Sequence, residues 1–160
     1  MNFLYLKSAE KTQNIDNPLN NEIFGEFKQI SPTGEDLLIY SKRAEQKTFF
    51  EDDNYTAFLQ GYVRDPLLSD NATLADHYKS FVEYIQKGAA DIQQRFSGIF
   101  STFLICKSTG DIYLSADWTS LYPVYYYITE DNIIISSSIV AIATYSSFEI
   151  DTIGILQRIA

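Results

Sequence analysis

The sequence is poor in the residues that form disulfides and metal centres. Its 160 residues include one cysteine, Cys106, and one histidine, His77. A single cysteine excludes an internal disulfide and a cysteine-based metal cluster, and His77 has no glutamate at helical spacing, so no metal site is predicted. Because the apolar run Phe103-Leu104-Ile105 precedes Cys106, as in a strand interior, we interpret Cys106 as a buried structural thiol.

Positive charge is also scarce. Twelve basic residues stand against twenty-one acidic ones, which leaves a net charge of −9. A chain of this sign offers a poor surface for phosphates, so neither nucleic acid nor an anionic membrane is an expected partner. No segment approaches the ~20 apolar residues of a membrane span, and the amino terminus has no basic region followed by a long apolar run. We therefore expect a cytoplasmic protein.

Short apolar and aromatic runs make up much of the chain. With 46% apolar and 15% aromatic residues, the composition excludes a disordered chain, and 160 residues fit one domain. The run Ile99–Cys106 is apolar on both faces, so we expect other layers to cover it on both sides. Runs between residues 37 and 63 alternate with turn residues and predict an antiparallel meander. The predicted strands cover residues 1–6, 37–40, 48–50, 55–63, 99–106, 111–116, 124–128 and 132–136.

A helix is predicted to follow the first strands. Thr73-Leu74-Ala75-Asp76 has the form of a capping box, with Asp76 at the third helical position. Apolar residues then recur at helical spacing up to Ile85, and Gly88 is the expected end of the helix. A second short helix is expected over residues 90–96. The whole pattern predicts an α+β fold with two stacked antiparallel sheets, in the layer order helix–sheet–sheet–helix.

Three motifs lie in order in the second half of the chain: Phe96-Ser97-Gly98-Ile99-Phe100-Ser101; then Asp117 with Pro123, Val124, Tyr125 and Tyr126; then Ser136–Ala143. They resemble the motifs Leu-x-Gly-x-Phe-Ala, Arg-Asp-x-x-Gly-x-x-Pro-Leu-Tyr-Tyr and Ser-Ser-Glu-x-x-Ala-Leu of the amino-terminal glutaminase domain of asparagine synthetases. Ala116 and Ser120 stand where that family has its arginine and glycine. The resemblance runs from about Tyr55 to Ala160.

The resemblance implies a four-layer αββα fold of the Ntn-hydrolase type, similar to the domains of β-lactam synthetases and lasso-peptide cyclases. It implies a glutamine amidotransferase-like domain over residues 1–149, in which Gly98, Asp117, Pro123 and Tyr125 have structural roles. Residues 150–160 are expected to begin a helix that leads towards a synthetase domain.

Loops that bind nucleotide phosphates are absent from the sequence. The chain has no Ser-Gly-Gly-x-Asp-Ser pyrophosphate loop, no Gly-x-x-x-x-Gly-Lys loop and no Gly-x-Gly-x-x-Gly loop. We therefore expect no cofactor in this chain. ATP and Mg²⁺ would enter only if a synthetase domain follows.

Most residues that hydrolyse glutamine in the family are replaced here. The family uses an amino-terminal cysteine, whereas this chain begins Met1-Asn2-Phe3. Its oxyanion motif Asn-Gly-Glu is matched by Gln60-Gly61-Tyr62, in which Gln60 is one methylene longer and Tyr62 replaces a substrate-binding carboxylate. By a softer alignment Asp36 replaces the arginine that binds the glutamine carboxylate. Asp76 matches a second amine-binding carboxylate, and its capping-box role is the alternative. We expect no catalytic residue and no glutaminase activity.

The function predicted from these observations is that of a catalytically degenerate glutaminase-like domain. It would be the structural or docking part of an ATP-dependent amide-forming enzyme of the asparagine synthetase type. Its partner would be a synthetase domain, in cis or in trans, and a peptide substrate is a further candidate partner. The alternative is a freestanding pseudoenzyme that binds a protein or peptide. The amide bond that the parent enzyme forms and the oligomeric state, a homodimer included, stay open.

Two aromatic features have alternative interpretations. Trp118 marks a contact surface if it is exposed and fills a gap between layers if it is buried. Tyr122, Tyr125, Tyr126 and Tyr127 place tyrosines on both faces of a strand. This arrangement favours a role in core and interface over a stacking platform for bases or sugars, and the negative charge of the chain agrees with that preference.

Overall fold

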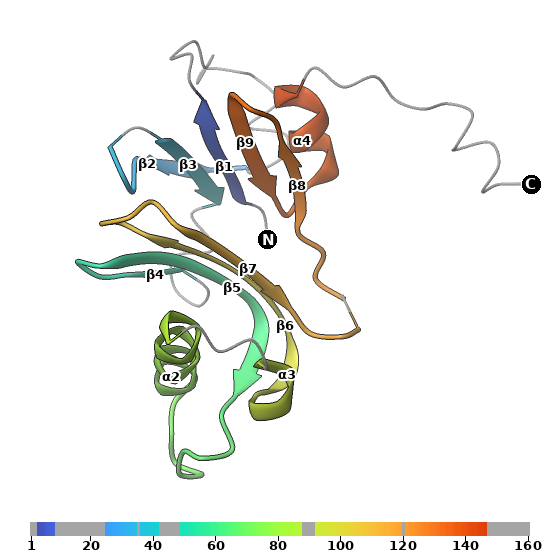
Figure 1. Ribbon diagram of the computed structural model, residues 1–160. Helices are drawn as coiled ribbons and strands as arrows, with labels where there is room; N and C mark the ends of the chain where they lie inside the picture. Colours follow the sequence, from blue (N-terminus) through green and yellow to red (C-terminus); the bar gives the residue numbers. More distant parts are fainter. Residues whose placement is uncertain are drawn as a thin grey trace, which may run out of the picture.

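The computed structural model describes residues 3–8, 25–34, 36–41, 49–87, 92–119 and 121–146. Within these ranges the chain forms two antiparallel sheets (Figure 1). Sheet A has the order β2-β3-β1-β9-β8 and sheet B the order β4-β5-β6-β7. The strands of sheet A are β1 (Phe3–Ser8), β2 (Phe27–Ile30), β3 (Asp36–Ser41), β8 (Tyr125–Ile128) and β9 (Asn132–Ser136). Those of sheet B are β4 (Phe49–Glu51), β5 (Tyr55–Arg64), β6 (Ser97–Cys106) and β7 (Ile112–Ala116).

The two sheets face each other across an aromatic core. Phe58 of β5 stacks on Phe3 of β1 with ring centroids 5.2 Å apart. Tyr40 of β3 contacts the Phe58 ring edge-on, with a centroid distance of 5.3 Å. Phe103 of β6 contacts Phe3 and Tyr5 at 5.3 and 5.2 Å. These rings are almost completely buried, and the inter-sheet layer therefore rests on aromatic contacts from both sheets.

Helices cover the outer faces of both sheets. Helix α2 (Leu74–Gln86) and the short α3 (Ile92–Arg95) lie against sheet B, where Tyr78 and Phe81 pack on Leu59 and Phe100. Helix α4 (Ile139–Tyr145) packs Ala141 and Ile142 against sheet A (Figure 1). The predicted α+β fold with two stacked antiparallel sheets is confirmed, and β6 is buried on both faces from Phe100 to Cys106, as its apolar pattern predicted.

One topological prediction is wrong. The runs between residues 37 and 63 do not form one meander, because β3 belongs to sheet A and β4 to sheet B. The meander in the structure is β4-β5-β6-β7, and β1 lies between β3 and β9. Runs of apolar residues identify individual strands. They do not say which sheet a strand joins when two sheets share one core.

The helix ends follow the predicted chemistry in part. Thr73 caps α2, and the helix ends at Gln86 with Lys87 as its C-cap. The predicted cap Gly88 lies outside the described residues. The second predicted helix is confirmed as the short α3. The predicted helix from residue 150 also lies outside the described residues. In the part of the chain that the structure describes, no helix has both the length and the apolar character needed to cross a bilayer.

Candidate functional site

One end of sheet B gathers several of the residues that the sequence singled out. Gly61 of β5 lies opposite Phe100 of β6, and Gly98 lies opposite Val63. Both glycines have positive φ, +84° at Gly61 and +136° at Gly98. A Cβ on Gly61 would lie 1.9 Å from the carbonyl oxygen of Ile99, and one on Gly98 would lie 2.2 Å from that of Tyr62. Both positions therefore require glycine, because the backbones of β5 and β6 approach too closely for a side chain.

The side chains next to Gly61 are engaged within the protein. The Gln60 amide oxygen accepts a hydrogen bond from Ser101 Oγ at 3.3 Å, in the space between the sheets. Tyr62 is exposed, so its ring offers contact area. As a tyrosine, it cannot supply the carboxylate that the family has at this position. The ring of Tyr122 covers Gly61, since its Cε2 atom lies 2.7 Å from where a Cβ on Gly61 would be. The predicted oxyanion position is therefore packed against the chain's own aromatic ring.

Asp117 organises the start of the loop that leads from β7 to β8. Its Oδ2 atom accepts the N–H of Phe100 at 2.8 Å, and its Oδ1 atom accepts the N–H of Thr119 at 2.7 Å and the Thr119 hydroxyl. The hydrogen bond from the Thr119 hydroxyl is the main cause that lowers the pKa of Asp117, and the two backbone N–H groups add to it. A carboxylate held in this way is ionised near neutral pH, so it positions the loop and is a poor general acid.

Trp118 follows Asp117 and is 83% exposed, so it does not fill a gap between layers, and its role in a contact surface stays a prediction. It borders a small cavity of about 210 Å³ that Gly98, Phe100 and Asp117 also line. Pro123 is exposed in the loop, and Tyr125 is half-buried at the start of β8, where it packs on the core that α4 covers. Tyr125 and Tyr127 face this core, so the core part of the prediction for these tyrosines is confirmed, while Tyr126 is exposed and its interface role stays a prediction.

The serines of the third motif hold the start of β1. Ser136 Oγ donates to the carbonyl oxygen of Phe3 at 2.6 Å, and the N–H of Phe3 donates to Ser137 Oγ at 3.0 Å. Ser138 caps α4 and accepts the N–H of Ala141. Each serine thus satisfies a backbone group at the junction of β9, β1 and α4, which is the physical reason for three successive hydroxyls here.

Asp76 serves the end of α2. Its carboxylate accepts the N–H of Thr73 at 2.9 Å and the Thr73 hydroxyl at 2.7 Å, while Thr73 Oγ1 accepts the N–H of Asp76. These hydrogen bonds, the one from the Thr73 hydroxyl first, lower the pKa of Asp76. The helix packs on the outer face of sheet B, whereas Gln60 lies on the inner face with Phe58. The structure therefore gives Asp76 its capping-box role and does not bring its carboxylate to the inner face beside Gln60.

Asp36 is also separate from Gln60 and Tyr62. Its Oδ1 atom accepts hydrogen bonds from Ser31 Oγ and from the N–H of Thr33, at 3.2 and 3.0 Å. It lies at the opposite end of β3 from Tyr40, whose ring contacts β5. Burial is the main reason that the pKa of Tyr5 is raised, and the nearby charge of Asp36 adds to it. Asp36 thus belongs to a turn at the edge of the inter-sheet core.

Cys106 is buried, as predicted, at the end of β6 far from Gly98. Hydrogen bonds from the hydroxyls of Ser108 and Thr109 lower the pKa of its thiol to about 7, although burial acts in the opposite direction. Among the described residues, no histidine or carboxylate is hydrogen-bonded to the sulfur, so this part of the structure shows a shielded thiol in a hairpin turn and no paired nucleophile.

Sequence reasoning missed a buried ionic network beside α2. Asp65 is fully buried, and its Oδ2 atom accepts hydrogen bonds from Arg95 at 2.7 Å and Ser80 at 2.5 Å. The N–H of Asp65 donates to Nδ1 of His77 at 3.1 Å. Asp65 directly follows β5, His77 and Ser80 lie on α2, and Arg95 lies on α3, so no local pattern in the sequence connects the four residues. The network ties α2 and α3 to the end of β5, and it leaves His77 Nδ1 occupied as an acceptor.

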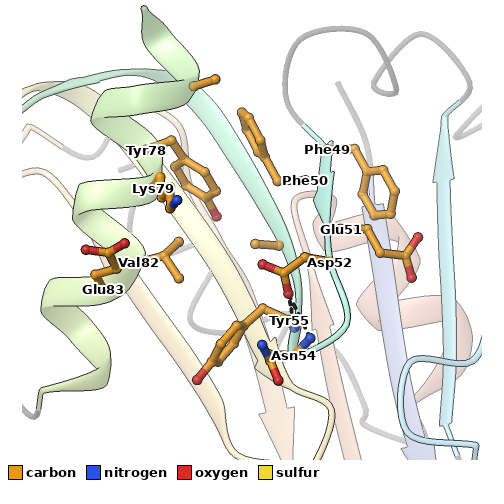
Figure 2. A pocket seen from close by; sticks show the side chains of 12 residues that line it. Phe49, Phe50, Glu51, Asp52, Asn54, Tyr55, Tyr78, Lys79, Val82 and Glu83 are labelled. Carbon is orange, nitrogen blue, oxygen red and sulfur yellow. Dashed lines mark hydrogen bonds between the residues drawn. The ribbon is translucent and has the colours of Figure 1, made fainter. Parts of the chain in front are cut away.

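A groove in the described part of the chain lies between α2 and the hairpin β4–β5 (Figure 2). It encloses about 560 Å³, within the range of ligand pockets. Phe50 and Tyr78 stack in it with ring centroids 4.2 Å apart, and Lys79 and Glu83 stand on its α2 side. The Asp52 carboxylate binds the N–H groups of Asn54 and Tyr55, both at 2.8 Å. The groove is thus apolar with a charged rim, and it holds no nucleophile hydrogen-bonded to a base.

In the ranges of the chain that the structure describes, no three His, Cys, Asp or Glu residues lie close enough together to hold a metal ion. No model of a protein family matches the chain, and no curated protein matches it.

Proposed function

We propose that this chain is a catalytically degenerate glutaminase-like domain of the Ntn-hydrolase type, with a four-layer αββα architecture, whose role is structural. It would dock on a synthetase domain of an ATP-dependent amide-forming enzyme, in cis or in trans. One observation carries the proposal. The residues selected by the resemblance from distant parts of the chain, Gln60-Gly61-Tyr62, Gly98 and Asp117, lie together at one end of sheet B, and the ring of Tyr122 covers Gly61.

The chemistry at this end supports a role without catalysis. Glutamine hydrolysis needs a thiolate with a base, a donor pair for the oxyanion, and charged groups for both ends of glutamine. Gln60 is hydrogen-bonded to Ser101, Tyr62 has no carboxylate, and Asp117 has its oxygens committed to backbone and hydroxyl donors. A docking role needs exposed apolar area, and Tyr62, Trp118 and Leu121 supply it.

The experiment that tests the absence of catalysis is an ammonia-release assay with glutamine. We expect no release above the blank, because loss of a positioned nucleophile costs many orders of magnitude in rate. The variant Asn2→Cys, which introduces a thiol near the amino terminus, should also release none, since Gln60 and Tyr62 do not form the family's oxyanion and ammonium sites. Release of ammonia that Gln60→Ala reduces would overturn the proposal.

The docking role is tested by the mass of the native polypeptide in its source cells. We expect either a product much larger than 18.3 kDa or a separate ATP-dependent ligase that co-purifies with the chain. The alternative function, a freestanding pseudoenzyme that binds another protein or peptide, would be favoured by an 18.3 kDa product that purifies without such a ligase.

A further inference from the structure

The groove between α2 and the β4–β5 hairpin has room for a ligand because two of the residues that line it are small (Figure 2). Ala57 of β5 and Ala75 of α2 stand where larger side chains would fill the space, and about 560 Å³ stays open between the two walls. Ligand pockets in proteins commonly have volumes of this size. None of the residues that the resemblance selected lines the groove, so it is distinct from the end of sheet B described above.

Aromatic rings form the apolar part of the groove. Phe50 of β4 and Tyr78 of α2 stack on each other with ring centroids 4.2 Å apart, and the half-buried Tyr55 belongs to the same lining. Val82 adds an aliphatic contact on the α2 side. A flat aromatic molecule can pack against such rings, and the faces of phenylalanine and tyrosine also attract cations. The lining therefore suits a ligand that combines an aromatic body with a positive charge.

The charged residues of the lining leave one carboxylate without a counterion. Glu51 is paired with Lys107 at 2.9 Å. Lys79 and Glu83 lie four residues apart on α2, a spacing at which opposite charges compensate each other. The remaining charge is that of Asp52 on the opposite wall, and no described cation is paired with its carboxylate. The groove thus keeps an excess of one negative charge that the described part of the chain does not neutralise.

One oxygen of Asp52 is available to a ligand. The Oδ1 atom accepts the N–H groups of Asn54 and Tyr55, both at 2.8 Å, and these hydrogen bonds fix the orientation of the carboxylate. No described donor binds Oδ2, and Figure 2 shows the carboxylate on the side of the hairpin that faces α2. The turn therefore presents an acceptor to the groove that is already oriented before a ligand binds.

We propose that the groove is a binding site for a small organic cation in which an ammonium group is joined to an aromatic body. The ammonium group binds Oδ2 of Asp52, and the aromatic body packs beside Phe50, Tyr78 and Val82. The site is independent of the proposed function, because it lies on the outer face of sheet B, where α2 packs.

Other ligand classes fit this lining less well. An anion would meet the uncompensated charge of Asp52 in a chain whose net charge is −9. A neutral apolar molecule would withdraw the carboxylate from water without giving it a partner, which costs free energy. A second copy of the chain carries the same net charge of −9 and is repelled. A cation with an aromatic body satisfies both the rings and the carboxylate.

The class of ligand is tested by NMR titration of the isotope-labelled chain with three indoles of similar size. Tryptamine is a cation at neutral pH, tryptophol is neutral and indolepropionate is an anion, while all three carry the same ring. We expect tryptamine to bind with a dissociation constant of about 1 mM or lower. Tryptophol should bind about fivefold more weakly, and indolepropionate more weakly still. Equal binding of the three, or no binding of tryptamine at about 10 mM, would overturn the proposal.

A pair of charge variants tests where the cation binds. Asp52→Asn removes the charge and keeps a side-chain oxygen for the N–H groups of Asn54 and Tyr55. It should weaken tryptamine binding about fivefold and change tryptophol binding by less than about twofold. The control is Glu130→Gln, which removes one negative charge in the β8–β9 turn of the other sheet and should leave tryptamine binding within about twofold. Equal weakening by both variants would assign the effect to the net charge and refute the site.

A variant that fills the groove tests the aromatic contact. Ala75 is exposed in the first turn of α2, so Ala75→Trp places a ring in the groove and leaves the charge and the buried core unchanged. It should weaken the binding of both tryptamine and tryptophol at least about tenfold while the circular dichroism spectrum stays that of the parent chain. In the parent chain, tryptamine should shift the amide resonances of α2 and the β4–β5 hairpin. Shifts confined to other elements, or binding that Ala75→Trp leaves intact, would contradict the assignment.

Discussion

Asp65 is the centre of a buried ionic network, and the sequence did not distinguish it from other aspartates. Burial alone would raise the pKa of its carboxyl group. Hydrogen bonds from Arg95, Ser80 and the N–H of Leu67 outweigh that effect and lower the pKa from its ordinary value of 3.8 to about 2. Arg95 also lies over the ring of Tyr84, 4.6 Å from its centroid. One carboxylate thus orients a cation that in turn packs on an aromatic ring.

Removal of the Arg95 guanidinium should show how much this network contributes to the stability of the fold. Arg95→Met is expected to lower the free energy of unfolding by about 3 kcal/mol at pH 7, because it leaves a buried carboxylate without its ionic partner. The matched control is Arg64→Met, which breaks the exposed pair Arg64–Asp70 and should change the stability by less than about 1 kcal/mol. Urea unfolding of the two variants measures both effects. Equal losses would show that the burial of Asp65 has no energetic consequence.

The lowered pKa of Asp65 predicts that the free energy of unfolding depends on pH. The folded-state pKa of Asp65 lies below the unfolded value, so its stabilising contribution is present above pH 3.8 and is lost as the pH falls through about 2. The stability difference between the parent chain and Arg95→Met should therefore shrink over this window. Unfolding curves collected across it check the sign, and a difference that grows towards low pH would contradict the assignment.

At the scale of the elements, local chemistry explains where helices begin, and long-range contacts explain where strands pair. The capping box of Thr73 and Asp76 fixes the start of α2 as the sequence predicts, and Ser138 caps the start of α4. Gly61 has no such local signal. Its need for glycine comes from the carbonyl of Ile99 and the ring of Tyr122, which belong to distant segments.

A pair of glycine variants separates backbone conformation from close approach. Gly61 and Gly34 have nearly the same φ, +84° and +86°, but a Cβ on Gly34 has no atom within 4 Å. Gly34→Ala should therefore cost only the conformational strain, about 1 kcal/mol. Gly61→Ala should cost about 3 kcal/mol or more, since β5 and β6 must move apart. Urea unfolding compares them, and a Gly61→Ala cost no larger than that of Gly34→Ala would refute the packing argument.

At the scale of the whole molecule, the two sheets are joined by aromatic rings. Phe58 contacts Phe3 and Tyr40 of sheet A, and Phe49 beside it in sheet B, with centroid distances between 5.1 and 5.3 Å. Since β3 and β4 are consecutive in sequence but lie in different sheets, this layer unites segments that no local pairing holds together. The stability of the sandwich therefore depends on a few rings in its centre.

Truncation of the central ring tests this dependence. Phe58→Ala should lower the free energy of unfolding by about 3–5 kcal/mol, because it removes buried contacts to both sheets and leaves a cavity. Leu67→Ala is the control, since Leu67 is 76% exposed, and its effect should stay within about 0.5 kcal/mol. Chemical denaturation gives both values. A small loss for Phe58→Ala would mean that the sheets are held by other contacts.

The sequence by itself determined the fold class, most strand positions, the start of α2 and the burial of Cys106, because these features follow from local periodicity and from capping and turn residues. Only the tertiary structure decided which sheet each strand joins, and it gave Asp76 its place in the capping box on the outer side of sheet B. It also decided that Trp118 is exposed, that Asp65 meets Arg95 and that Tyr122 covers Gly61. These outcomes depend on contacts between residues far apart in the chain, whose energies no single segment contains.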